Sequence, residues 1–365
     1  MTKHTLCAFV MASSLFGLLP FSSQAGLPDR LEQPASHSDA AKSVMLLDIA
    51  RSGENLVAVG DLGVILISVN EGRDWQQVSS PVSTLLTAVF FQEDQGWVTG
   101  HDGVLLTSKD AGLTWEKVLD GHTINALLVE DAQSKLESLQ ADAYADAMDI
   151  EDAEFDLEDA EVAMEEGPVN PLLDVLFTSS QTGVVVGAYG LALSTVDGGQ
   201  TWTSFADRLP NPDRLHLNAL LQADDQLYIA GEAGLLLKSY DQGQSWQSLP
   251  SPYDGSFFAL AQHQDELLAL GLRGNLFRSL DAGYEWHPVH VEPTVSFLGA
   301  QSHSGLLAIT GLGGTLLLGP DSNQLLTQPL NTRRHFNSVI ATEQGWILVG
   351  EQGVFLSNRA KELAQ

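Results

Sequence analysis

A motif that recurs about every forty residues limits the folds open to this chain more than any other feature of its sequence. In its clearest copy, residues 96–115, two short apolar runs meet at a G-x-x-G turn and a Ser-x-Asp-x-Gly-x-x-Trp motif follows. The seven turns begin at Gly60, Gly100, Gly187, Gly231, Gly271, Gly311 and Gly350. Their spacings are 40, 87, 44, 40, 40 and 39 residues, so the chain holds seven copies, with an insertion of about forty-five residues in the second gap.

The repeat predicts strands. Short β-branched runs separated by Gly and Asp are typical of strands joined by tight turns. A period near forty residues with about four strands per unit is typical of propeller blades. Helical solenoids share this period, but these runs alternate and have no helical periodicity. We therefore expect an all-β fold: a seven-bladed β-propeller of four-stranded antiparallel blades over residues 43–358, with a C-terminal tail at 359–365.

The first 25 residues have the pattern of a secretory signal peptide. Lys3 and His4 precede an apolar run at residues 6–21, and residues 22–25, SSQA, supply small side chains before a cleavage site. The one cysteine, Cys7, lies inside this segment, so the mature chain would have no disulfide and would depend on its core. We expect export to the periplasm or cell envelope, without direct insertion into the membrane.

Residues 26–42 are polar and contain no copy of the turn, while the seventh copy breaks off at Asn358, before any outer strand. A propeller ring has to close, and one terminus commonly lends a strand to the blade at the other. We therefore expect residues 30–33 to supply the outer strand of the last blade. The alternative is an ordered leader that pairs with no strand.

The insertion at residues 121–167 has a composition of its own. It holds fifteen acids against the single Lys135, and no Gly or Pro occurs between His122 and Glu166. Apolar residues recur at helical spacings, which predicts one or two acidic amphipathic helices after the second blade. These residues are Leu136, Leu139, Tyr144, Met148, Phe155 and Val162. The insertion is either a solvated helix on the rim or a docking arm for a partner; its acids lack the order and the glycine of a calcium loop.

The formal charge of the chain is −30. This charge argues against binding to nucleic acid and to anionic membrane surfaces, because both require basic patches. It suits a soluble envelope protein or a partner with a basic face.

The Ser-x-Asp-x-Gly-x-x-Trp motifs are Asp boxes, and we assign them a structural role. The carboxylate can accept hydrogen bonds from amides of its own turn, Gly adopts a conformation that a side chain would forbid, and Trp packs between sheets. Asn70 replaces the Asp in the first copy, which favours turn formation over chemistry. The predicted structural residues are Asp110, Trp115, Asp197, Trp202, Asp241, Trp246, Asp281 and Trp286. We expect no cofactor and no metal.

Asp boxes also occur in sialidases and related glycosidases, so a glycan-active or glycan-binding propeller is the alternative function. A sialidase needs three converging arginines, and this chain has few arginines. A pair of catalytic carboxylates could still be present, because separation in sequence does not give separation in space. The chain has no G-x-S-x-G, no H-E-x-x-H and no phosphate loop.

Binding residues are expected around the central funnel. In a propeller, the turns between second and third strands and the segments leading into first strands open at the same end. The G-x-x-G turns place there Asp61, His101, Asp102, Tyr189, Glu232, Arg273 and Glu351. The leading segments add His216, Phe257 and His335. A funnel of mixed charge and aromatic character is the default binding surface, and a solvated rim is the alternative for each residue.

Several stretches together carry a family resemblance: LLDIARSGENLVAVGDLGVIL, LTAVFFQEDQGWVTGHDGVLL, NPLLDVLF, NPDRLHLNAL, LYIAGEAGLLL, PYDGSFFAL and GLRGNLFRS. From about residue 29 to 358 the chain resembles the photosystem II stability/assembly-factor-like family of seven-bladed propellers, related to BNR-repeat proteins, and in particular its non-photosynthetic bacterial branch. The resemblance implies an exported, non-enzymatic protein, often encoded beside resistance-nodulation-division exporters, whose partner is a membrane complex or transporter. Photosynthetic members bind chlorophyll-protein precursors through an arginine-rich face, and this chain has no such patch.

Overall fold

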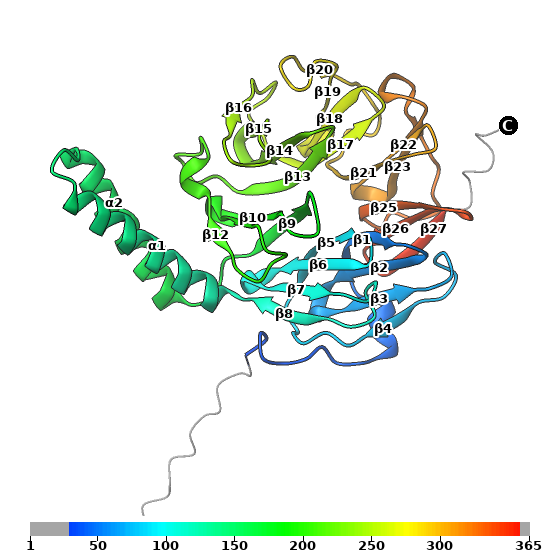
Figure 1. Ribbon diagram of the computed structural model, residues 1–365. Helices are drawn as coiled ribbons and strands as arrows, with labels where there is room; N and C mark the ends of the chain where they lie inside the picture. The colour runs from blue at the N-terminus through cyan, green and yellow to red at the C-terminus, as the bar shows by residue number, and fades with distance from the viewer. Residues whose placement is uncertain (1–28, 358–365) are drawn as a thin grey trace, which may run out of the picture.

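Seven antiparallel sheets surround a central axis in the computed structural model, which describes residues 29–357 (Figure 1). The innermost strands lie side by side in the order β1, β5, β9, β13, β17, β21, β25 and back to β1. The prediction of a seven-bladed all-β propeller is therefore confirmed. Six sheets have four strands, and the seventh has three among the described residues.

Blades 1 and 2 precede the insertion, and blade 3 follows it. Blade 1 comprises β1 (Leu46–Ser52), β2 (Asn55–Gly60), β3 (Ile65–Ser68) and β4 (Gln76–Val78). Blade 2 comprises β5 (Leu86–Gln92), β6 (Gln95–Gly100), β7 (Leu105–Ser108) and β8 (Glu116–Leu119). Blade 3 comprises β9 (Leu172–Phe177), β10 (Gly183–Gly187), β11 (Ala192–Thr195) and β12 (Thr203–Ser204).

Blades 4 to 7 follow at a regular spacing. Blade 4 comprises β13 (Leu217–Ala223), β14 (Gln226–Gly231), β15 (Leu236–Ser239) and β16 (Gln247–Ser248). Blade 5 comprises β17 (Phe257–His263), β18 (Glu266–Gly271), β19 (Leu276–Ser279) and β20 (His287–Pro288). Blade 6 comprises β21 (Phe297–His303), β22 (Leu306–Gly311), β23 (Thr315–Gly319) and β24 (Leu326–Thr327), and blade 7 comprises β25 (Phe336–Thr342), β26 (Gly345–Gly350) and β27 (Gly353–Ser357).

The core lies between neighbouring blades, so the middle strands are buried on both faces. Val57 and Val59 of β2 pack in one cluster with Val89 of β5 and Val98 of β6. A strand covered on both sides needs a continuous apolar run, which explains the runs of Val, Leu and Ile in the repeat. This burial between blades holds the ring together.

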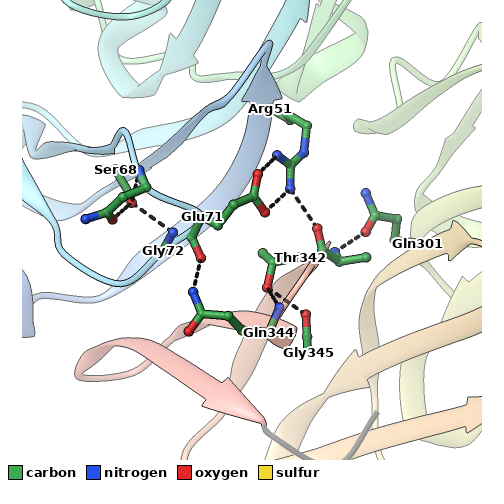
Figure 2. A network of polar contacts seen from close by, with 10 residues as sticks. Arg51, Ser68, Glu71, Gly72, Gln301, Thr342, Gln344 and Gly345 are labelled. Carbon is green, nitrogen blue, oxygen red and sulfur yellow. Dashed lines mark hydrogen bonds and ion pairs between the residues drawn. The ribbon is translucent and has the colours of Figure 1, made fainter. Parts of the chain in front are cut away.

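Blades 1 and 7 close the ring through apolar packing and a polar network. Ile347 and Val349 of β26 share a cluster with Leu46 and Leu56 of blade 1. Figure 2 shows the network, in which Arg51 donates to both carboxylate oxygens of Glu71, at 2.5 and 3.1 Å, and to the carbonyl of Ala341 at 2.9 Å. The side chain of Gln344 donates to the carbonyl of Glu71, and the amide of Ala341 donates to Gln301.

The structure corrects the prediction for the closing strand. Residues 30–33 form a turn, and no described residue before β1 belongs to a strand. Leu31 is buried in the cluster that blades 1 and 2 share, and Lys117 of β8 donates to its carbonyl and to Glu32. The segment ends in a short 3-10 helix, Asp39–Ser43. An apolar anchor at Leu31 thus fastens the segment to blades 1 and 2, along β4 and β8 (Figure 1).

The acidic insertion forms the predicted helices. Helix α1 (Gly121–Ala141) and helix α2 (Ala147–Glu166) pack as a hairpin, which we call the arm, and it projects from the ring between blades 2 and 3 (Figure 1). Ile124 is buried in the cluster of blades 2 and 3, and Asn125 donates to the carbonyls of Ala163 and Gly167. The base of the arm is therefore part of the propeller core.

The predicted signal peptide at residues 1–25 and the tail at 359–365 lie outside the described residues. Within residues 29–357, neither helix of the arm is long and apolar enough to span a bilayer.

Candidate binding face

The G-x-x-G turns and the segments leading into the blades lie at one end of the propeller, which we call the turn face. The residue after the first Gly of each turn donates its amide to the carbonyl just before the blade's first strand; examples are Asp61 to Met45 and Glu232 to His216. The second Gly has a positive φ and no room for a side chain: a Cβ on Gly63 would lie 2.1 Å from the carbonyl oxygen of Val82. The turns therefore form a fixed rim.

Two histidines of the turn face join neighbouring blades. His216 accepts a 2.8 Å hydrogen bond at Nδ1 from the amide of Tyr189 in the preceding blade, and the two rings meet edge to face at 4.8 Å. Its own amide donates to Glu232. His335 repeats the arrangement, accepting at Nδ1 from the amide of Gly313, while its amide donates to Glu351. The structure thus brings together Tyr189, His216 and Glu232, and separately His335 and Glu351.

The other predicted residues do not gather into one site. Asp61 caps its own turn by accepting from the amide of Leu62, and Asp102 accepts from the hydroxyl of Thr84. His101 is partly exposed, and Arg273 is exposed on a different blade.

The structure corrects the assignment of Phe257 to the funnel. The Phe257 ring is fully buried in the core that blades 4 and 5 share, edge to face with Tyr253 at 5.4 Å and with Phe277 at 6.1 Å. It occupies the first position of β17, where the other first strands carry buried Leu or Phe. Phe257 is therefore a core residue and not part of the binding face.

Two aspartates of the innermost strands were not predicted as site residues. Asp48 of β1 accepts from the amide of Val89 at 2.9 Å, and Asp174 of β9 accepts from the amide of Leu220 at 2.7 Å. Although both residues are partly exposed, burial of the carboxyl raises the pKa of Asp48, and burial together with the charge of Asp48 raises the pKa of Asp174 to about 7. The signal was the shared text LLD, which puts an acid two residues after the buried Leu that begins each of these strands.

Ion pairs tie the arm to the turn face. Lys135 of α1 lies 2.9 Å from Asp156 of α2 and 2.9 Å from Asp207, which follows β12. Arg214, in the segment leading into blade 4, lies 2.7 Å from Asp156 and 3.1 Å from Asp159. These contacts join both helices of the arm to the segment between β12 and β13, so the arm has a defined attachment to blades 3 and 4.

The Asp boxes lie at the opposite end of the blades, which we call the Asp-box face. In the box of blade 2, Asp110 accepts from the hydroxyl of Ser108 at 2.9 Å and from the amide and hydroxyl of Thr114 at 2.9 and 2.6 Å. Trp115 is buried and donates to the carbonyl of Gly112. The boxes around Asp197, Asp241 and Asp281 repeat the hydrogen bonds to Asp from the hydroxyl two residues before it and from the amide four residues after it, and Trp202 repeats the Trp contact.

Trp246 and Trp286 occupy the same place in the boxes of blades 4 and 5, but their indole N–H groups have no acceptor among the described residues. Asn70 replaces the Asp in blade 1 and accepts from the amide of Asp74. Every carboxylate of a box is thus bound to its own turn.

A caged lysine lies nearby. Nζ of Lys238 donates to the carbonyl of Ala282 and stands 4.5 to 5.3 Å from the ring centres of Tyr228, Tyr240 and Tyr284. Burial lowers the pKa of Lys238. The three tyrosine rings thus surround the ammonium group of Lys238 and join blades 4 and 5.

Two shallow hollows of the surface contain none of the predicted binding residues. One, of about 450 Å³, is lined by Glu93, Asp94, Lys109 and their neighbours on the Asp-box face. The other, of about 220 Å³, is lined by Gly274, His290 and Glu292. Within residues 29–357, no group of three His, Cys, Asp or Glu side chains is arranged to hold a metal ion.

The blade order, the turns and the Asp boxes define a seven-bladed propeller of the Asp-box class. The family described as "Photosynthesis system II assembly factor YCF48" matches residues 36–124 and 156–316, which together make up more than half of the chain. The chain therefore belongs to this family. The gap between the two matched parts falls within the arm. Among curated proteins the sequence has no match.

Solved structures share the fold. "YCF48 bound to D1 peptide" is 13% identical with a TM-score of 0.59, and covers 86% of this chain and 92% of its own. YCF48 from Cyanidioschyzon merolae is 14% identical with a TM-score of 0.59, and covers 88% and 97%. A GH74 enzyme from Niastella koreensis is 12% identical with a TM-score of 0.52, and covers 86% of this chain but 43% of its own. At such identities the likeness shows the fold alone.

Proposed function

We propose that this protein is an exported, non-enzymatic propeller that binds a protein partner and acts as an assembly or stability factor for a membrane complex, such as a transporter. Membership of the YCF48 family is the observation that carries the proposal. One solved structure with the same fold is YCF48 bound to a D1 peptide, which makes a peptide segment a reasonable ligand for this chain as well.

The geometry of the turn face supports binding in preference to chemistry. The carboxylates of Asp61, Glu232 and Glu351 each accept a hydrogen bond from a backbone amide of the rim. A glycosidase needs two carboxyl groups facing one another across the scissile bond. On this face the acids instead hold turns in place, and the rim they build is a fixed platform for a partner.

Purification of the tagged full-length chain from its own membranes tests the proposal. We expect subunits of one membrane complex to be recovered in amounts comparable to the tagged protein. Deleting the gene should lower the abundance of that complex, and the full-length chain should restore it. Unchanged abundance together with no membrane protein recovered would contradict the proposed role.

Export is tested separately by sequencing the N-terminus of the protein isolated from the cell envelope. We propose that the mature chain begins at Gly26. An intact N-terminus on protein found in the cytoplasm would contradict this.

The alternative is a glycan-active propeller, favoured by the fold shared with the GH74 enzyme. It predicts that the purified protein hydrolyses sialosides or glucans. Turnover that disappears when a carboxylate is replaced would support this alternative and overturn the non-enzymatic proposal.

A further inference from the structure

The exposed surface of α2 carries an apolar stripe. Met148, Phe155 and Val162 follow one another at intervals of seven residues, and their exposed fractions are 70%, 57% and 49%. Seven residues are close to two helical turns, so the three side chains lie in one row about 21 Å long. Tyr144, 95% exposed, lies in the loop between the two helices, four residues before Met148.

The stripe is not the surface that joins the two helices. Ala153, the fully buried residue of α2, lies two positions before Phe155 and therefore on the opposite side of the helix. The packing of α1 against α2 leaves the stripe uncovered. Apolar residues in a row differ from the single exposed ones found on most surfaces, because a row can bury area in one contact.

Acids line both edges of the stripe. Glu151, Asp152, Glu158 and Asp159 stand three or four positions from Phe155, so they lie beside it on the same face. Arg214 pairs with Asp159, whereas no ion pair among the described residues involves Glu151, Asp152 or Glu158. The bases near the arm, Lys135 and Arg214, are already engaged in attaching it to the propeller.

We infer that this stripe is a docking site for a cationic amphipathic helix of the partner protein, with apolar side chains facing the stripe and Lys or Arg facing the acids. The inference rests on the proposed function and names the chemistry of the partner. A second copy of the chain would bring the same acids against the stripe, and its charge of −30 repels association. An anionic lipid surface is repelled for the same reason. A basic helix is complementary in both shape and charge.

The first experiment titrates the full-length mature protein with a fluorescent 21-residue peptide of Leu and Lys, arranged so that Leu forms one helical face. A peptide of the same composition in scrambled order measures simple charge attraction. We expect the amphipathic peptide to bind at least about tenfold more tightly, because only it can bury Leu against the stripe.

Variants locate the site. Replacing Met148, Phe155 and Val162 together by Ser should weaken peptide binding by about tenfold or more. The matched control replaces Val69, Val196 and Leu280 by Ser, since these apolar residues are at least half exposed but stand on three separate blades. It should change the affinity less than about twofold. Circular dichroism and thermal unfolding check that each variant is folded.

Charge is tested by Glu151→Gln, Asp152→Asn and Glu158→Gln in one variant, which should weaken binding at low salt and flatten its salt dependence. Equal binding of both peptides, or equal affinities of the stripe and control variants, would overturn the inference. If the stripe variant then still recovered the membrane complex from cells, the proposed function would stand and only the docking site would be refuted.

Discussion

The aspartates of this propeller have surroundings that shift their pKa in opposite directions. In the Asp boxes, hydrogen bonds from Thr201 and Ser245 lower the pKa of Asp197 and Asp241 to about 2. In the innermost strands, burial raises the pKa of Asp174 to about 7. The box acids thus contribute stability that is lost as the pH falls below the ordinary range of a carboxyl. Asp174 contributes stability that is present at low pH and lost as the pH rises.

The upward shift in the pKa of Asp174 gives a prediction. Its folded-state pKa of about 7 lies above the ordinary aspartate value of 3.8, so between these values the folded protein binds more protons than the unfolded one. The contribution of Asp174 should fall, by on the order of 3 kcal/mol, as the pH rises from about 4 to above 7. In Asp174→Asn, which keeps an acceptor for Leu220, this component should disappear.

Denaturant unfolding of the parent protein and of Asp174→Asn at several pH values between 4 and 8 measures this pH-dependent contribution. Asp174→Asn should be the more stable protein at pH 8 and similar to the parent near pH 4. A constant difference across the range would show that Asp174 does not titrate in this window.

An Asp box gives a second prediction at this scale. Asp110→Ala removes the acceptor of the Thr114 amide, which should lower the free energy of unfolding by about 1–2 kcal/mol. Asp110→Asn should lose less, because Asn70 already fills this role in blade 1. Partner binding should survive in the folded protein. Chemical denaturation compares the variants, and equal losses for Ala and Asn would contradict the account.

At the scale of elements, Leu31 is the largest fully buried side chain of the N-terminal segment. Leu31 is 1% exposed in the core of blades 1 and 2, so Leu31→Ala should lower the free energy of unfolding by about 2–4 kcal/mol. Leu62→Ala, at a residue 58% exposed, is the matched control and should cost less than about 0.5 kcal/mol. Similar losses from both substitutions in urea unfolding would show that the segment does not stabilise the ring.

The arm is divided between a structural base and a projecting hairpin. Replacing residues 130–159 by a short Gly/Ser loop keeps Ile124 and the bond from Asn125 to Ala163, and the thermal unfolding midpoint should be nearly unchanged. Deleting residues 121–167 also removes Ile124, so it should cost about 1–3 kcal/mol more. A trimmed protein that fails to fold would show that the outer hairpin covers part of the core.

These elements show what the sequence could predict. A periodic pattern of apolar residues indicates which positions are buried, so the strands of the seven blades and the acidic helices could be predicted from the sequence. The anchor at Leu31 lies in a polar segment that repeats nowhere else in the chain, so no periodicity predicts which blades bury it. From the sequence alone, Phe257 could line the funnel or pack in the core. Its position in the repeat identifies its strand but not the side chains against which its ring packs.

At the scale of the whole molecule, the ring and the arm have separate tasks. The network of Arg51, Glu71 and Gln344, with the apolar packing beside it, joins blade 7 to blade 1 (Figure 2). Closure fixes the seven turns on one face, and the arm projects from that end of the ring. The Asp-box face is shaped by turns that bind their own acids. A partner is therefore expected on the turn face and the arm.

In-cell photo-cross-linking tests this expectation most directly. A photoreactive phenylalanine analogue is placed at Phe155 on the arm, Leu62 on the turn face or Val196 on the Asp-box face, all exposed in the folded protein. The account predicts cross-links to one membrane protein from positions 155 and 62 and none from position 196. Cross-links only from position 196, or none from the arm and turn face of a folded, correctly exported protein, would contradict it.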